Sequence, residues 1–184
     1  MKILFLFILV ATQSLICCKK AEPEIFLIPE KFSGKIQIIY NQNGIPLKYK
    51  NGYGKDTIYT SKIGEPIKYE NGARVYKIPE IGILLTQFSS NNGIINQKYF
   101  LVSKNGKRVP LPVFGRKRKN IDYANIDKNK IGIFAHAIVG VYGNQNVPYQ
   151  EFVVSNYNEI DSLYTFEYEK IFNEKLHETF GVDY

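Results

Sequence analysis

Residues 64–79 read GEPIKYENGARVYKIP, and this stretch indicates the fold most clearly. Its Asn71-Gly72 pair suits a type I′ turn, because both residues tolerate a positive φ. Such a turn predicts a β-hairpin with the pairs Glu70–Ala73, Tyr69–Arg74 and Ile67–Tyr76. Alternation along the strands then places Ile67, Tyr69, Arg74, Tyr76 and Ile78 on one face, and Lys68 and Glu70 on the other.

A near-copy of this hairpin precedes it. Residues 44–52 read GIPLKYKNG, with the same Gly, Pro, Lys-Tyr and Asn-Gly at the same spacing. The return strand, residues 53–60, is less regular, because Gly54, Lys55 and Asp56 stand where a strand should begin. We interpret residues 44–72 as a duplicated hairpin of which the core needs one copy. The alternative is chance similarity between two polar turns.

Turn signals and short apolar runs fill most of the remaining chain. Asn-Gly pairs occur at 43–44, 51–52, 71–72, 92–93 and 105–106. The runs between and beside them are 24–28, 35–40, 66–69, 74–78, 83–88, 98–103 and 108–114. The stretch IGIFAHAIVGVY, residues 131–142, is rich in β-branched residues and favours a strand or a bent strand pair over a buried helix. The pattern predicts a mostly-β fold, an antiparallel sheet or a β-sandwich of short strands.

The tail has a different period. Aromatic and apolar residues recur every four positions from residue 164 to residue 180, with charged residues between them: Tyr164, Tyr168, Phe172, Leu176 and Phe180. This spacing predicts a C-terminal amphipathic helix over about 159–180 that lays its aromatic stripe on the sheet. Asn158 or Ser162 is expected to cap its start, and Gly181 to end it.

The first twenty residues, MKILFLFILVATQSLICCKK, have the features of an export signal. The apolar run is about half of the roughly 20 residues that a spanning helix needs. Leu15-Ile16-Cys17-Cys18 resembles the end of a bacterial lipoprotein signal, with Cys18 as the lipidated residue and Cys17 as the small residue before the cut. We therefore expect a signal peptide at 1–17, a lipid-anchored tether at 18–23 and one domain at 24–184. The alternative is an ordinary cleaved signal with incidental cysteines.

The composition limits the chemistry that the domain can carry. Both cysteines lie in the first 18 residues, so the mature domain has no disulfide and no thiol nucleophile. The chain has only two histidines, and His136 in its apolar run reads as a packed core residue, while His177 falls on the charged side of the tail helix. We expect no metal and no cofactor.

The strongest charge feature is the basic run Arg116-Lys117-Arg118-Lys119, in a chain of formal net charge +7. Its ordinary interpretation is a solvated loop. The functional interpretation is a contact surface for an acidic protein or an anionic glycan, in addition to the membrane that the lipid anchor engages. Nucleic acid is a poor candidate partner for an exported protein.

Several motifs together resemble an uncharacterised domain family of bacterial lipoproteins. That family has an IPE-x-[FY]-x-G opening, here residues 28–34, and RVY-x-IP and GIL-x-T strands, here residues 74–79 and 82–86. The resemblance covers roughly residues 25–110 and implies no function. The extra twenty residues of the first hairpin copy depart from the pattern. The motif residues themselves suit strand ends and turns.

We thus expect an exported, lipid-anchored protein of the cell envelope with a non-enzymatic binding or structural domain. An immunity-type inhibitor of a rival's toxin is the alternative. A glycan-processing enzyme is a further one, in which Glu30 and Glu80, each after an Ile-Pro pair, would flank the site as paired carboxylates. A toxin partner would form a stoichiometric complex, whereas an enzyme would show turnover.

Overall fold

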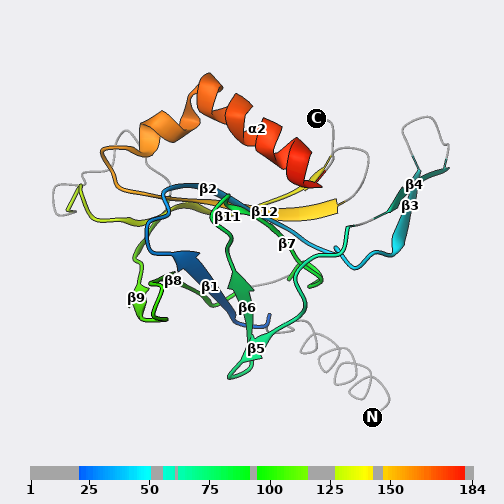
Figure 1. Cartoon of the computed structure of the whole chain (residues 1–184), viewed down its shortest axis with the longest axis horizontal. Coiled ribbons are helices and arrows are strands. Elements are labelled where there is room, and N and C mark those ends of the chain that lie inside the picture. Colours follow the sequence, from blue (N-terminus) through cyan, green and yellow to red (C-terminus); the bar gives the residue numbers. More distant parts are fainter. Residues whose placement is uncertain are drawn as a thin grey trace, which may run out of the picture.

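The computed structural model describes residues 21–50, 56–60, 62–91, 95–115, 127–142 and 147–180. Two five-stranded sheets face each other, and one helix covers the outer face of the second sheet (Figure 1). The prediction of a mostly-β fold with a C-terminal helix is confirmed. In the described ranges, no helix combines the length and the apolar character needed to cross a membrane.

The first sheet has the order β5-β6-β1-β8-β9. Its strands are β1 (Glu24–Pro29), β5 (Tyr69–Glu70), β6 (Ala73–Lys77), β8 (Gln97–Val102) and β9 (Arg108–Pro110). The central strand β1 runs parallel to both neighbours, β6 and β8. The N-terminal ends of these three strands therefore lie together at one end of the sheet.

The second sheet has the order β10-β11-β12-β2-β7. Its strands are β2 (Gly34–Ile39), β7 (Ile83–Leu85), β10 (Val113–Gly115), β11 (Gly132–Tyr142) and β12 (Val147–Ser155). The predicted strand over 131–142 is confirmed as β11, with an irregular register between Phe134 and Ile138. Both sheets are mixed and not purely antiparallel as expected, because β10–β11 and β2–β7 are parallel pairs as well.

The core lies between the two sheets and is built by alternation. Ile36, Ile38 and Tyr40 point from β2 and its end toward the first sheet, where they meet Phe26 of β1 and Tyr76 of β6. The intervening residues of β2 point the other way, toward the helix. All six residues of β2 are buried as a result, because the second sheet is the middle layer of three.

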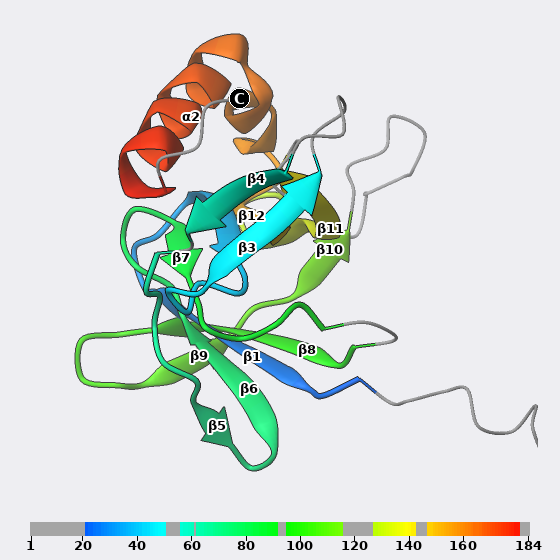
Figure 2. The same cartoon turned by 90° about the vertical axis from the view of Figure 1, so that its right-hand side faces the viewer.

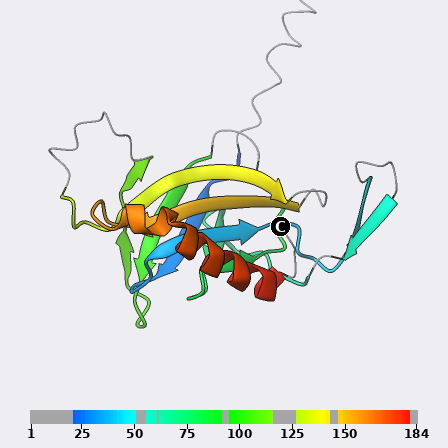
Figure 3. The ribbon, with the colours of Figure 1, turned by 90° about the horizontal axis from the view of Figure 1, so that it is seen from above.

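The C-terminal segment forms two pieces, η2 (Ile160–Tyr164), a 3₁₀ turn, and α2 (Phe166–Phe180). Figure 3 shows α2 lying across β2 and β12. Phe172, Leu176 and Phe180 pack on the second sheet as the stripe predicted, but Tyr164 lies in the 3₁₀ turn and is exposed. The predicted caps are wrong: Asn156 Oδ1 accepts the N–H groups of Asn158 and Glu159 before η2.

The start of α2 itself is capped by Thr165, whose Oγ1 accepts the N–H of Tyr168 at 3.3 Å. The predicted end, Gly181, lies outside the described residues. The helix therefore starts seven residues later than position 159, because the η2 turn takes up the first part of the predicted range.

The hairpin of residues 64–79 forms as the sequence predicts. Tyr69 pairs with Arg74 and Glu70 with Ala73, and both turn residues have positive φ, 50° at Asn71 and 76° at Gly72. The third predicted pair, Ile67–Tyr76, is absent from this ladder, since β5 has only two residues. The Val75 N–H instead donates to the Lys68 carbonyl at 3.0 Å.

The first copy also forms an antiparallel pair, β3 (Pro46–Lys50) with β4 (Asp56–Thr60). This pair is a separate two-stranded sheet that projects from the side of the domain (Figures 1 and 2). The segment that carries β3 and β4 closes at its base, where Asn43 bridges to Ile63 and the Gly64 N–H donates to the Gln42 carbonyl at 2.6 Å. Only the second copy contributes a strand to the core.

Deleting residues 44–63 is therefore expected to leave a folded domain. The deletion joins Asn43 to Gly64. The two ends already lie close together, because Asn43 bridges to Ile63 and Gly64 bonds to Gln42. The deletion also removes few contacts of the core. The lost bond from the Lys62 ammonium to the Thr179 carbonyl at the end of α2 contributes to the cost. We expect the free energy of unfolding to fall by no more than about 1–2 kcal/mol, as measured by urea denaturation.

A deletion of equal length, residues 64–83, serves as the matched control. It removes β6 with the buried Tyr76 and is expected to abolish the cooperative unfolding transition. If the 44–63 deletion also lost that transition, the first copy would be part of the folding unit and the duplication interpretation would be wrong.

Candidate functional site

The two sites predicted from the sequence fall outside the described residues. This holds for the lipidation residue Cys18 and for the basic run of Arg116, Lys117, Arg118 and Lys119. Both stay predictions. Glu30 and Glu80, the residues considered for paired acid–base chemistry, lie exposed in turns after β1 and after β6. Exposed turn positions suit hydration of these carboxylates better than a desolvated catalytic site. His177 is exposed on α2.

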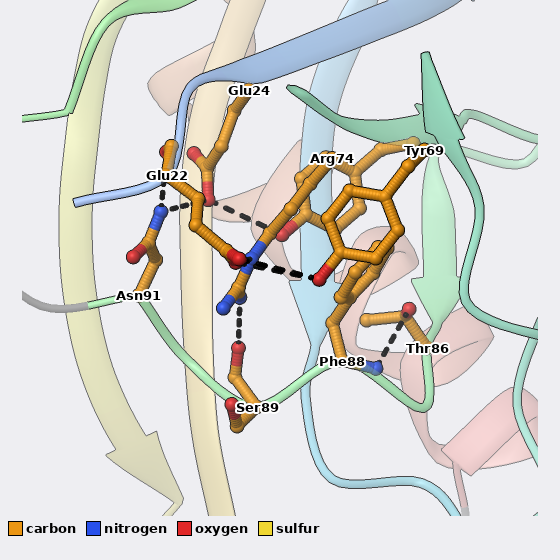
Figure 4. A network of polar contacts seen from close by, with 9 residues as sticks. Glu22, Glu24, Tyr69, Arg74, Thr86, Phe88, Ser89 and Asn91 are labelled. Atoms are coloured by element: carbon orange, nitrogen blue, oxygen red, sulfur yellow. Dashed lines mark hydrogen bonds and ion pairs between the residues drawn. The ribbon is translucent and has the colours of Figure 1, made fainter. Parts of the chain in front are cut away.

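The structure brings together a different set of polar residues, at the end of the first sheet where β1, β6 and β8 begin (Figure 4). We call it the β1 polar network, and its members are Glu22, Glu24, Arg74, Tyr76, Asn91 and Gln97. Glu24 is fully buried at the first position of β1. Its carboxylate accepts hydrogen bonds from Gln97 Nε2 at 2.8 Å, Tyr76 Oη at 3.2 Å and Asn91 Nδ2 at 3.3 Å. These donors satisfy a carboxylate that would otherwise be costly to bury.

Arg74 provides the positive charge of the network. Its Nε donates to Glu22 Oε2 at 2.5 Å, its Nη1 donates to the Ser89 carbonyl at 2.5 Å, and its guanidinium lies 5.0 Å from the ring centre of Phe88. Burial alone would lower the pKa of Arg74, but the interactions with Glu22 and Tyr76 together outweigh this effect, and the pKa is raised. The guanidinium therefore stays charged and fixes the strand end by three contacts at once.

Buried phenols surround the carboxylate of Glu24. Burial raises the pKa of Tyr76 and of Tyr99, and the charge of Glu24 raises both further. Both hydroxyl groups thus remain protonated donors. Tyr76 also meets the ring of Tyr40 edge-on, and Tyr40 Oη donates to Gln150 Oε1 on β12 at 2.7 Å. Polar contacts therefore reach from the start of β1 across the core to the second sheet.

A second polar cluster lies between the second sheet and α2, and we call it the Lys35 cluster: Lys35, Gln37, Glu151, Tyr168 and Glu169. The Lys35 ammonium contacts both carboxylate oxygens of Glu169, at 2.5 and 2.6 Å, and one oxygen of Glu151 at 3.7 Å. It also lies 5.1 Å from the ring centre of Phe172. The Lys35 N–H donates to Tyr168 Oη at 2.8 Å, so backbone and side chain of Lys35 both hold α2 on the sheet.

Burial raises the pKa of Glu151 above its ordinary value of 4.5, although the charge of Lys35 opposes the shift. The native state therefore binds a proton at Glu151 more readily than the unfolded chain does. The stability that this proton contributes is present below about pH 4.5 and is lost as the pH rises through the folded pKa. We expect wild-type stability to fall across this interval relative to Glu151→Gln, whose free energy of unfolding should change less with pH.

Urea denaturation at a series of pH values measures this difference. Glu167→Gln is the matched control, because Glu167 is exposed on the same helix that provides Glu169. The control should keep the wild-type pH profile. A Glu151→Gln profile that parallels the wild type would show that Glu151 ionises in the folded protein as it does in water.

Both clusters are closed arrangements in which each charge meets a partner. This geometry holds strands and helix together. Across the part of the chain that the structure describes, no three acidic, histidine or cysteine residues lie close enough to hold a metal ion.

Sequence reasoning did not single out either cluster, although a signal was present. Glu24 is in phase with the buried residues Phe26 and Ile28 of β1, and Arg74 falls on the same predicted face as Tyr76. Lys35 lies in β2, whose apolar residues occupy both faces. A charged residue on the inward face of a strand indicates a buried partner of opposite charge or a set of donors. The identity of that partner depends on strand order, which the pattern does not give.

This chain is similar to known proteins in a protein family and among solved structures. No curated protein matches it. A crystal structure of a Bacillus anthracis protein, named as a candidate lipoprotein, is similar at 15% sequence identity and a TM-score of 0.49, over 88% of this chain and 99% of that chain. The model of a family of unknown function (DUF6843) matches residues 54–163, more than half of the 184 residues, so the chain belongs to this family, in agreement with the resemblance to an uncharacterised domain.

Proposed function

We propose that this protein is an exported lipoprotein of the bacterial cell envelope whose domain acts by binding or by structural contact and not by catalysis. The observation that carries the proposal is the position of Cys18, at the end of a signal-like segment and six residues before Glu24, where β1 begins. A lipid on Cys18 would hold the folded domain directly at the membrane. Several acyl chains on one residue make such anchoring stable.

The polar clusters support a non-enzymatic role. Lys35, Arg74 and Glu24 are the buried charged residues of the two clusters, and each is engaged by groups of the protein itself. A catalytic acid, base or nucleophile needs a face open to substrate. The closed pairs fit residues that set the geometry of the domain.

The basic run at 116–119 is the candidate contact surface for an acidic protein or an anionic glycan. Four adjacent positive charges attract acidic partners, and salt screens such an attraction over roughly 8 Å at physiological ionic strength. The membrane, engaged through the lipid, is the other partner. The proposal includes no cofactor and no nucleic acid.

Replacing Cys18 with serine tests the anchor. The variant Cys18→Ser is expected to lose all fatty-acid label in metabolic labelling and to leave the membrane fraction, because serine has no thiol to carry the lipid. The variant Cys17→Ser is the matched control. It keeps a small residue before the cut and should retain both label and membrane association.

Label that persists in Cys18→Ser and disappears in Cys17→Ser would place the lipid on the other cysteine. Absence of label from the wild-type protein would contradict the lipoprotein proposal as a whole. The two outcomes are distinguishable in one experiment, because all three proteins are labelled side by side.

A further inference from the structure

We propose that the edge of the first sheet at Ile67, Lys68 and Tyr69 rests on the phospholipid surface that holds the lipid anchor, so that α2 faces away from the membrane. This inference rests on the proposed lipidation of Cys18 and goes beyond it, because a lipid alone sets no orientation. We call these three residues the β5 edge. Its partner is a bilayer with anionic headgroups.

The first argument is the length of chain between the lipid and the domain. Four residue steps separate Cys18 from Glu22, and a fully extended chain spans roughly 3.5 Å per residue, so the distance is at most about 14 Å. Whatever surrounds Glu22 therefore lies within reach of the headgroup region. A flexible linker long enough to let the domain turn freely is not available.

The second argument is that the chain is fixed from Glu22 onward. The Glu22 carboxylate is paired with Arg74, and the Glu22 carbonyl accepts a hydrogen bond from Asn91 Nδ2 at 2.7 Å. The Arg74 N–H donates to the Pro23 carbonyl at 2.8 Å, and the Glu24 N–H to the Asn96 carbonyl at 2.9 Å. The short tether thus joins the domain at a fixed point.

The third argument is the chemistry of the side chains beside that point. Tyr69 Oη lies 3.4 and 3.5 Å from the carboxylate oxygens of Glu22, which puts the β5 edge next to the tether (Figure 4). Tyr69 is 53% exposed and Ile67 is 50% exposed, and Lys68 is exposed between them. Tyrosine, an aliphatic residue and lysine are the combination that favours the membrane–water interface.

Charge at this surface is compatible with an anionic bilayer. Glu22 is paired with Arg74, and Glu70, which follows the β5 edge, is held by Arg108 at 2.7 and 2.8 Å. These pairs compensate the two carboxylates, so Lys68 adds a positive charge to the surface. Tyr69 also packs edge-on against Phe88 with 5.5 Å between ring centres, which holds one side of its ring on the domain and leaves the other exposed.

The opposite end of the molecule provides a matched control. In Figure 1, α2 lies at the top and β5 at the bottom, with the second sheet between them. Phe166, the first residue of α2, is 86% exposed. In the proposed orientation, Phe166 is remote from the membrane and Tyr69 touches it.

The chain has no tryptophan, so a single introduced tryptophan reports on one position. We would prepare the acylated full-length mature protein as Tyr69→Trp and as Phe166→Trp, and reconstitute each into phosphatidylglycerol–phosphatidylethanolamine vesicles with brominated acyl chains. We expect the fluorescence of Tyr69→Trp to shift to the blue and to be strongly quenched. Phe166→Trp should show neither change. Ile67→Trp is a second reporter on the same edge, should Tyr69→Trp perturb folding.

The outcomes separate the orientation from the anchor. Protein that floats with the vesicles while both β5-edge reporters remain unquenched would overturn the orientation and leave the lipoprotein proposal intact. Quenching of Phe166→Trp in place of Tyr69→Trp would show the reverse orientation. Acylated protein that fails to float with vesicles would contradict the proposed function itself.

Discussion

Replacing Phe26 with alanine is expected to lower the free energy of unfolding by about 3–5 kcal/mol, the usual cost of removing a buried phenylalanine. Phe26 is fully buried at the middle of β1. Its ring stacks between Tyr76 and Tyr99, at 5.0 and 4.8 Å, and meets Phe152 of the second sheet edge-on at 5.3 Å. No smaller side chain fills the space between these three aromatic rings.

Urea denaturation measures this loss, and the matched control is Phe166→Ala. The same atoms are removed there from a ring that is 86% exposed, so the free energy of unfolding should change by no more than about 0.5 kcal/mol. Domains of this kind have a total stability of about 5–15 kcal/mol, so the loss at Phe26 is a large share of it. Equal effects of the two substitutions would show that the sheets do not pack through Phe26.

The sequence predicts the local elements of this fold well, and the reason is alternation. Buried and half-buried residues alternate along β1 with the period of two, and the Asn71-Gly72 turn fixes its own register. Strand order cannot be predicted from alternation. β1 pairs with β6 and β8, which lie about fifty and seventy positions further along the chain, and nothing in a short alternating run selects such partners.

Two elements were harder to read for specific physical reasons. β12 was not predicted as a strand, since it is buried on one face by the first sheet and on the other by α2 and η2, so its pattern does not alternate. The helix was predicted seven residues too early, because Asn156 directs a 3₁₀ turn before Thr165 begins the α-helix. In both cases the structure of the segment depends on the residues that pack against it, and a local sequence pattern does not identify those residues.

The candidate site resembles the fold in this respect: its local features follow from the sequence, and its long-range partners do not. Alternation places Glu24 and Arg74 on inward faces and Lys35 on the face of β2 that α2 covers, but their partners come from distant segments: Gln97, Glu22 and Glu169. The repeat could be interpreted from the sequence because a hairpin is a local unit, and β3–β4 indeed forms a separate pair. A polar network forms only when distant segments come together in the fold. The sequence could therefore indicate that these charged residues have partners, but not which residues the partners are.

The substitution Arg74→Ala is expected to lower the free energy of unfolding by about 2–3 kcal/mol. The change removes the charge that pairs with Glu22, the bond to the Ser89 carbonyl and the contact with Phe88. Breaking a fully buried ion pair from one side costs about 3–5 kcal/mol. The loss here is smaller, because the Glu22 side chain is 45% exposed and water can solvate its carboxylate once Arg74 is gone.

Arg108→Ala is the matched control for Arg74→Ala in denaturation measurements. Arg108 makes two short hydrogen bonds to the carboxylate of Glu70, so by distance alone this pair resembles the pair of Arg74 with Glu22. Its side chain is 36% exposed against 11% for Arg74, so water and salt weaken the Arg108 pair far more. If burial and not distance sets the strength of these pairs, only Arg74→Ala will be strongly destabilising, and added salt will remove the small effect of Arg108→Ala. Equal losses would show that the contact of Arg74 with the start of β1 is no stronger than a surface pair, and the proposed orientation of the domain on the membrane would lose its support.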